Sequence, residues 1–156
     1  MKKLTLLLVG LSFCGTLHAQ EIASFNFAYN HLALSVKDVD RSAEFYMNVL
    51  KLPEITNRSK FEGVRWFTFS DGLELHLIST IKEKVVVNRA LHLALTTSNF
   101  DAFVKMLESK GIAYSDWPGS RQKVNIRADG IKQVFFQDPD GYWIEVNSIA
   151  TTPGKN

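Results

Sequence analysis

An internal repeat constrains the fold of this chain more than any other feature of its sequence. The segment His31-Leu-Ala-Leu-Ser35 recurs as His92-Leu-Ala-Leu-Thr96. Each copy is followed by the spacing of an amphipathic helix and then by segments with the composition of strands. No Pro-, Gly- or Ser-rich linker separates the two halves. We therefore expect one domain, over residues 29–149, built from two similar halves.

Each half is predicted to contain one helix after its first strand. The first helix is predicted over residues 41–50 and the second over residues 100–110, because both segments repeat apolar residues on one face. Pro53 and Gly111 follow these segments, as is common after a helix end. Candidate N-caps precede both helices, namely Asp38 or Asp40 for the first and Ser98 or Asn99 for the second.

A hairpin is predicted after each helix, so that each half is a strand, a helix and about three further strands. A two-residue turn at Asp71-Gly72 would pair Phe67 with His76 in the first hairpin. A four-residue turn in the second hairpin would pair Val134 with Glu145. This count predicts that His76 and Glu145 hold equivalent positions in the two halves. Paired halves of this kind would enclose a cleft into which every second strand residue points.

The chemistry of the repeat suggests a metal site. His31 and His92 each begin a strand at matching positions of the repeat, and imidazole nitrogens are common ligands of transition metals. Glu145 lies in an otherwise apolar strand, where a carboxylate has to be paired, ligated or turned outward. Glu74 and His76 are two residues apart, so they share one face of their strand. These five residues are the candidate ligands.

The first twenty residues have the layout of a secretory signal peptide. Lys2 and Lys3 precede an uncharged apolar run over residues 4–17, which is shorter than the ~20 residues of a spanning helix. Small and polar residues follow at Ala19-Gln20. We expect cleavage near residue 20 and a periplasmic or secreted mature protein, with no membrane association after cleavage.

Removal of this segment limits what the mature chain can do. The only cysteine, Cys14, lies within it, so neither a disulfide nor a thiol nucleophile remains. The full chain carries a net charge of +2, and loss of Lys2 and Lys3 balances the acidic and basic residues. Nucleic-acid binding needs clustered Lys and Arg, so we do not expect a nucleic-acid partner. A small molecule is the expected ligand.

The sequence resembles the glyoxalase / bleomycin-resistance / extradiol-dioxygenase (vicinal oxygen chelate, VOC) superfamily. The resemblance rests on the opening strand and helix over residues 31–46 and on the segment over residues 129–145, with its Asp-Pro-Asp-Gly turn. It implies an α+β fold of paired βαβββ modules around a metal-containing cleft. It also implies that His31, His92 and Glu145 are metal ligands, with Glu74 or His76 as the fourth.

The same resemblance implies chemistry on a small oxygenated substrate. In this family a divalent ion (Zn, Ni, Mn or Fe) chelates two neighbouring oxygens, which supports lyase, isomerase or dioxygenase reactions. Glu145 is the first candidate for a catalytic base and Glu74 is the second. The resemblance also allows a homodimer, because some members share the cleft between chains.

Three other functions remain open from the sequence. The chain could sequester a small molecule without catalysis, as bleomycin-resistance members do, or it could be a catalytically idle domain. A lactoylglutathione lyase is less favoured, because glutathione-using members carry Arg and Asn where this chain has Ser35 and Ile78. Glutathione is also a cytosolic thiol, whereas export is expected here. Retention of the histidines and Glu145 favours the metal-dependent enzyme.

Overall fold

The computed structural model describes residues 27–150. The predicted signal peptide, residues 1–20, lies outside the described residues. Within residues 27–150, no helix has both the length and the apolar character needed to cross a membrane.

The first half of the chain forms a four-stranded sheet with one helix. Its strands run in the order β1-β4-β3-β2, with β1 parallel to β4 and the other pairs antiparallel. The elements in chain order are β1 (His31–Ser35), α1 (Val39–Asn48), β2 (Glu54–Ile55), β3 (Val64–Thr68) and β4 (Glu74–Ile78). The βαβββ order expected from the sequence is therefore present in this half.

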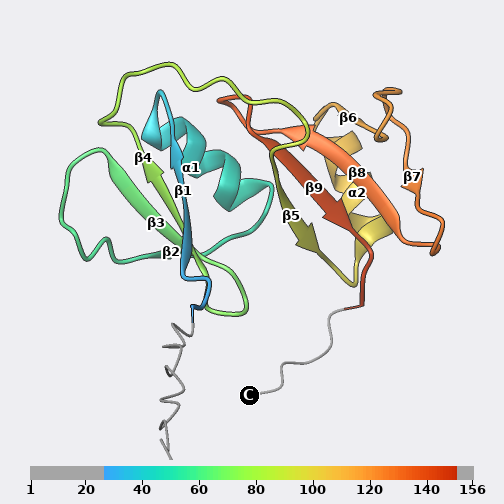
Figure 1. Ribbon diagram of the computed structural model, residues 1–156, viewed down its shortest axis with the longest axis horizontal. Coiled ribbons are helices and arrows are strands. Elements are labelled where there is room, and N and C mark those ends of the chain that lie inside the picture. Colours follow the sequence, from blue (N-terminus) through green and yellow to red (C-terminus); the bar gives the residue numbers. More distant parts are fainter. Residues whose placement is uncertain (1–26, 151–156) are drawn as a thin grey trace, which may run out of the picture.

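The second half repeats this arrangement and adds one short strand. The path through its sheet is β5-β9-β8-β6, and β7 also pairs with β8. The elements are β5 (His92–Thr96), α2 (Phe100–Ser109), β6 (Tyr114–Ser115), β7 (Asn125–Ile126), β8 (Lys132–Gln137) and β9 (Trp143–Asn147). Figure 1 shows the two halves side by side, each with its own sheet. We call them the first and second modules. The predicted paired-module α+β fold is confirmed.

Both helices begin close to the predicted caps. The Asp38 side chain accepts hydrogen bonds from the backbone N–H groups of Asp40 and Arg41, so α1 begins at Val39, two residues before the predicted start. Asn99 is the N-cap residue of α2, although its side chain makes no capping hydrogen bond. The predicted range of the first helix, residues 41–50, therefore lies two residues further along the chain than the observed helix, Val39–Asn48.

The two hairpin turns differ in length from the prediction. His76 pairs with Trp66 rather than Phe67, and Glu145 pairs with Phe135 rather than Val134. Backbone hydrogen bonds from Phe69 to Leu73 and from Asp138 to Tyr142 leave three residues in each loop, with Gly72 (φ 82°) and Gly141 (φ 94°) in the left-handed region. The predicted turns of two and four residues were each wrong by one residue, in opposite directions.

The equivalence of His76 and Glu145 survives this correction. Ala33 of β1 lies opposite His76, and Ala94 of β5 lies opposite Glu145. The structural equivalence of the two halves therefore extends from β1 and β5 to their neighbours β4 and β9. By the same register, the residue opposite His31 is Glu74 and the residue opposite His92 is Trp143.

One hydrophobic core joins both modules. It contains alternate residues of the sheets, such as Leu75, Leu77, Ile144 and Val146, together with apolar residues of α1 and α2. Side chains alternate along a strand, so the other face of each sheet turns away from the helices. We call this the open face. The candidate residues His31, Glu74, His76, His92 and Glu145 all lie on the two open faces.

Polar contacts fasten α1 to the β8–β9 turn of the second module. The buried Tyr46 hydroxyl donates to Asp138 Oδ2 at 2.9 Å, and the Ser42 hydroxyl donates to Asp140 Oδ2 at 2.7 Å. The Tyr142 hydroxyl donates to the Ser35 carbonyl oxygen at 2.9 Å. Asp138 is 6% exposed, so its hydrogen bonds are needed to offset its desolvation. The Asp-Pro-Asp-Gly turn thus joins the two modules.

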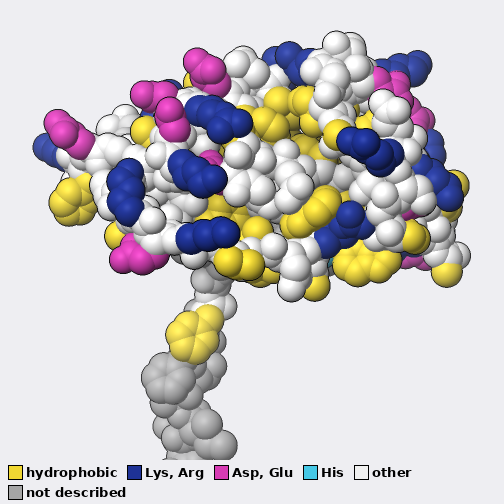
Figure 2. All heavy atoms as spheres, turned by 90° about the horizontal axis from the view of Figure 1, so that it is seen from above, with side chains coloured by type: hydrophobic (Ala, Val, Ile, Leu, Met, Phe, Trp, Pro, Cys, Tyr) yellow, Lys and Arg dark blue, Asp and Glu magenta, His cyan; other side chains and the backbone are white. Residues whose placement is uncertain are grey.

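The surface carries charges of both signs. On the face seen in Figure 2, Lys and Arg side chains lie among acidic, apolar and uncharged groups. They do not merge into one continuous basic area on that face. This mixture agrees with the low net charge of the chain.

Candidate metal centre

The open face of the first sheet brings three of the candidates together. The rings of His31 and His76 stack with their centroids 4.3 Å apart, and Trp66 stacks on the other side of His76 at 4.0 Å. His76 Nε2 lies 2.8 Å from Glu74 Oε2. His31, His76 and Glu74 therefore form one group of adjacent polar side chains, which packs against the Trp66 ring.

The stacking limits how these two histidines can coordinate a metal. The imidazole planes of His31 and His76 are inclined by 15°. A histidine binds zinc in its ring plane at ~2.0–2.1 Å from the nitrogen, so two nearly parallel stacked rings cannot direct their lone pairs at one ion. In this arrangement His31 and His76 cannot both ligate the same metal.

Glu74 carries a second strong contact. Arg58 Nη2 lies 2.7 Å from Glu74 Oε1 and 2.9 Å from Oε2, and the Arg58 guanidinium lies over the Trp66 ring at 4.6 Å. Hydrogen bonds from Arg58 and then from His76 lower the pKa of Glu74. This carboxyl group is thus held ionised beside His31.

The open face of the second sheet holds the other pair. His92 Nε2 lies 3.3 Å from Glu145 Oε2, across the parallel β5–β9 pair. The side chain of His92 keeps 22% of its surface exposed and that of Glu145 keeps 9%. The pair is therefore partly accessible through the His92 side chain, although the carboxylate itself is nearly buried.

The remaining polar atoms of this pair are already engaged. His92 Nδ1 lies 2.9 Å from the carbonyl oxygen of Arg89, which accepts a hydrogen bond from Nδ1–H and so directs Nε2 toward Glu145. Glu145 Oε1 accepts hydrogen bonds from Gln133 Nε2 at 2.7 Å and from Asn147 Nδ2 at 2.9 Å. The two remaining atoms, His92 Nε2 and Glu145 Oε2, face each other at 3.3 Å. This donor set fits a divalent transition metal.

His31 is oriented in the same way as His92. Its Nδ1 lies 2.6 Å from the Asn30 side-chain oxygen, and among residues 27–150 no side chain or backbone group hydrogen-bonds to its Nε2. The two modules therefore each contribute one histidine with a directed Nε2. Within residues 27–150 of a single chain, however, no three His, Cys, Asp or Glu side chains are grouped so that they could hold a metal ion.

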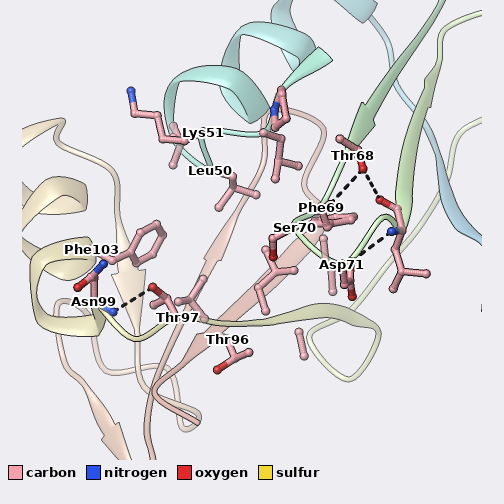
Figure 3. Close-up of a pocket in the computed structure, with 18 of the residues that line it drawn as sticks. Leu50, Lys51, Thr68, Phe69, Ser70, Asp71, Thr96, Thr97, Asn99 and Phe103 are labelled. Atoms are coloured by element: carbon pink, nitrogen blue, oxygen red, sulfur yellow. Dashed lines mark hydrogen bonds between the residues drawn. The ribbon is translucent and has the colours of Figure 1, made fainter. Parts of the chain in front are cut away.

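A large cavity of the described structure lies elsewhere. A cleft of about 1670 Å³ separates the two modules on their helical side. Figure 3 shows Phe69, Ser70 and Asp71 of the β3–β4 turn on one side, with Thr96, Thr97 and Asn99 on the other. None of the five candidate ligands lines this cleft. A smaller cavity of about 450 Å³ includes His92 in its lining.

The sequence reasoning missed the residues that orient the candidate ligands. Gln133 and Asn147 are polar residues in apolar strands, at the same parity as Phe135 and Glu145. That pattern could have placed them on the face of Glu145. The role of the Arg89 carbonyl oxygen had no signal in the sequence, because any residue supplies a carbonyl there.

Comparisons with known proteins agree with this architecture. The family described as Glyoxalase/Bleomycin resistance protein/Dioxygenase superfamily matches residues 28–146. "Glyoxylase I 4" of Arabidopsis thaliana is 30% identical over 135 residues, which cover 80% of this chain and 72% of that protein. "Metallothiol transferase FosB" of Shouchella clausii is 29% identical over 123 residues, which cover 76% of this chain and 78% of that protein.

A solved structure also resembles the whole fold. The crystal structure of a glyoxalase/dioxygenase from Nostoc punctiforme superimposes with a TM-score of 0.64 at 26% sequence identity. The superposition covers 85% of this chain and 98% of that one. Together with the paired βαβββ modules, these matches show that the chain belongs to the Glyoxalase/Bleomycin resistance protein/Dioxygenase superfamily.

Proposed function

We propose that this protein is a divalent-metal-dependent enzyme that acts on a small substrate carrying two neighbouring oxygens. The metal ligands are His31, His92 and Glu145, with a further ligand from the open face of the first sheet. The reaction is of the lyase, isomerase, transferase or dioxygenase type. The similarity to proteins named as a glyoxylase and a metallothiol transferase supports this range.

The geometry of His92 and Glu145 carries the proposal. A buried carboxylate is costly unless each of its oxygens has a partner. Glu145 Oε1 has two donors, whereas Oε2 faces only His92 Nε2, at 3.3 Å, among residues 27–150. Hydrogen bonds to the far atoms of metal ligands are the usual way in which proteins orient them. The pair is thus arranged as half of a metal site.

We propose that a second copy of the chain completes the site. Within one chain, the His31 group and the His92–Glu145 pair lie on separate sheets and do not combine into a ligand set in residues 27–150. β1 and β5 are both at the edge of their sheets, so each presents unpaired backbone groups. A two-fold dimer that places β1 of one copy beside β5 of the other would make two identical sites.

Glu74 is our candidate for the fourth ligand. It lies directly opposite His31 in the β1–β4 register, and His76 cannot share an ion with His31 while their rings are stacked. His76 instead supports Glu74 through the 2.8 Å hydrogen bond. The position of His76, equivalent to that of Glu145, still makes it the alternative ligand.

The bound ion would polarise the two substrate oxygens as a Lewis acid. If Glu145 released the metal, its Oε2 could accept a proton from the substrate, while Gln133 and Asn147 hold the other oxygen in place. The nearly buried position of Glu145 would strengthen its electrostatic interaction with the substrate. A glutathione adduct is not the favoured substrate, because Ser35 and Ile78 replace the expected Arg and Asn.

We also propose that the chain is exported and cleaved near residue 20. The proposal rests on the sequence of residues 1–20 alone. N-terminal sequencing of the protein recovered from the periplasm or medium tests it, since an intact Met1 there would contradict cleavage.

Metal analysis of the purified protein tests the proposed function. We expect one bound divalent ion per chain in the parent, and its loss in His92→Ala and Glu145→Gln. Glu83→Gln is the matched control, because Glu83 is exposed and has no role in the site. A parent without affinity for Zn, Ni, Mn or Fe would contradict the proposal and favour a small-molecule binding protein. Unchanged metal content in both site variants would also contradict it.

A further inference from the structure

We propose that Trp117 forms a fixed aromatic wall beside the metal site and that Arg89 is the positioning residue that holds it there. The substrate would then carry a flat, apolar group next to its two chelating oxygens. This inference rests on the proposed function, since it takes His92 and Glu145 as metal ligands.

The wall belongs to the loop over residues 116–124, between β6 and β7 (Figure 1). Both strands pair with β8, through Ser115 opposite Phe135 and Asn125 opposite Gln133. The two ends of the loop are therefore fixed at the strand that carries Gln133, one of the residues that orient Glu145.

The Trp117 ring lies next to His92. Its centroid is 6.3 Å from that of His92 and 5.4 Å from that of Phe135, both in edge-to-face arrangements. The Phe135 ring itself meets His92 edge-to-face at 5.8 Å. Phe135 is 2% exposed, whereas Trp117 keeps 49% of its surface exposed. Beside the His92 ring, the molecule thus presents a large aromatic surface to solvent.

Hydrogen bonds within the loop give it a defined shape. The buried Asp116 carboxylate accepts from the backbone N–H groups of Gly119 at 2.9 Å and Ser120 at 2.7 Å. Gly119 has φ of 103°, a conformation that residues with a side chain rarely adopt. The Lys123 ammonium lies 3.5 Å from Asp116 Oδ2. These contacts give the loop a defined conformation. Asp116, the only acidic residue of the loop, is fully engaged by them.

Arg89 joins this loop to the metal ligand. Its Nη1 donates to the carbonyl oxygens of Asp116, at 3.2 Å, and of Trp117. Its guanidinium lies over the Trp143 ring at 4.4 Å, and its own carbonyl oxygen holds His92 Nδ1. One residue therefore fixes the orientation of His92 through its backbone and the position of Trp117 through its side chain.

The contacts of Arg89 and Lys123 favour a substrate whose group next to Trp117 is apolar rather than anionic. The charges of Arg89 and Lys123 are already directed at carbonyl oxygens, at a ring and at Asp116. An indole surface binds flat apolar groups with little loss of side-chain freedom, because it is rigid. A group attached to oxygens chelated beside His92 would lie against that surface.

A pair of hydroxamates that differ only in their apolar group tests this inference. Acetohydroxamate and benzohydroxamate both chelate through two oxygens, and binding to the full-length, cobalt(II)-loaded protein can be followed by visible absorption. Each affinity is compared with that for free cobalt(II). We expect the protein to prefer benzohydroxamate about tenfold or more. Trp117→Ala should reduce this ratio to about one, while Trp117→Phe should keep most of it.

The Arg89 variants separate positioning from general stability. Arg89→Lys and Arg89→Gln should both lower the benzohydroxamate preference, because neither side chain can donate to both carbonyl oxygens and stack on Trp143 as a planar group. Acetohydroxamate should bind within about twofold of the parent. A merely structural role would weaken both chelators equally. Phe61→Ala, which removes an exposed aromatic ring elsewhere, should leave the ratio unchanged.

The possible failures are distinguishable. If cobalt(II) binds and Trp117→Ala keeps the benzohydroxamate preference, or if the parent has none, the aromatic wall is wrong while the metal site stands. If the parent binds neither cobalt(II) nor Zn, Ni, Mn or Fe, the proposed function fails and this inference fails with it.

Discussion

His92 Nε2 and Glu145 Oε2 lie 3.3 Å apart on the open face of the second sheet, and the other polar atom of each side chain is held by a hydrogen bond. An imidazole and a carboxylate arranged in this way can act together on one ligand. The rest of the proposed site depends on this pair, so the first predictions concern the groups around it.

Gln133→Met should weaken metal binding without removing a ligand. The substitution removes the 2.7 Å hydrogen bond that holds Glu145 Oε1, so the carboxylate loses part of its orientation. Loss of such a supporting contact typically costs about 10- to 100-fold in metal affinity. Competition titration with a chromophoric chelator measures the change. Gln137→Met, on the same strand but exposed, should bind metal as the parent does.

Substitutions of Glu74 and His76 distinguish the two candidates for the fourth ligand. We expect Glu74→Gln to lower metal affinity by about tenfold or more, because an amide oxygen is a much weaker ligand than a carboxylate. His76→Phe keeps the stack between His31 and Trp66 and should change the affinity by less than about threefold. The reverse order of effects would identify His76 as the ligand.

Tyr46→Phe should destabilise the fold without affecting the metal ligands. It leaves Asp138 Oδ2 without its 2.9 Å partner in a buried position. We expect a loss of about 1–3 kcal/mol in the free energy of unfolding, measured by urea denaturation. Phe45→Leu, a change on the same helix that removes no hydrogen bond, serves for comparison. Equal stability of Tyr46→Phe and the parent would show that the junction between the modules does not depend on this bond.

Asp138 should give the stability a characteristic pH dependence. Burial raises the pKa of this carboxyl group above its ordinary value of 3.8, although hydrogen bonds from Tyr142, Tyr46 and Asp140 act in the opposite direction. Between the unfolded and folded pKa, the folded protein holds more protons than the unfolded chain. The contribution of Asp138 to the free energy of unfolding therefore falls as pH rises through the window just above 3.8.

Comparison with Asp138→Asn isolates this contribution from that of other carboxylates. The parent should lose stability relative to the variant as pH rises above 3.8, measured by urea denaturation at each pH. Parallel stability curves for the two proteins would contradict the shifted pKa.

The sequence predicted the fold well because the fold follows from the spacing of apolar residues and from the internal repeat. The spacing of apolar residues marked both helices, and the shared segments beginning at His31 and His92 marked the two first strands. The equivalence of His76 and Glu145 followed as well, even though both turns were predicted with the wrong length. The two errors fell in opposite directions, and each arose because a glycine with positive φ sets a three-residue loop that sequence spacing does not reveal.

The details of the site depended on contacts between distant segments. Nothing in the sequence indicated that the Tyr46 hydroxyl meets Asp138 or that the Arg89 side chain reaches the loop of Trp117. The stacking of His31 on His76 also required the β1–β4 register, which is a parallel pairing between strands far apart in the chain. Such pairings are fixed by the packing of the whole molecule rather than by local spacing.

Mixing two defective variants tests the shared metal site most directly. His31→Ala and Glu145→Gln are each expected to bind no metal as homodimers. If His31 of the partner subunit completes the site of His92 and Glu145, dissociating and reassociating an equal mixture restores one intact site in each heterodimer. The metal content of the mixture should then recover to about one quarter of the parental value, because about half of the dimers are mixed and each has one of two sites intact. No recovery, in a mixture whose subunits have demonstrably exchanged, would contradict the shared site.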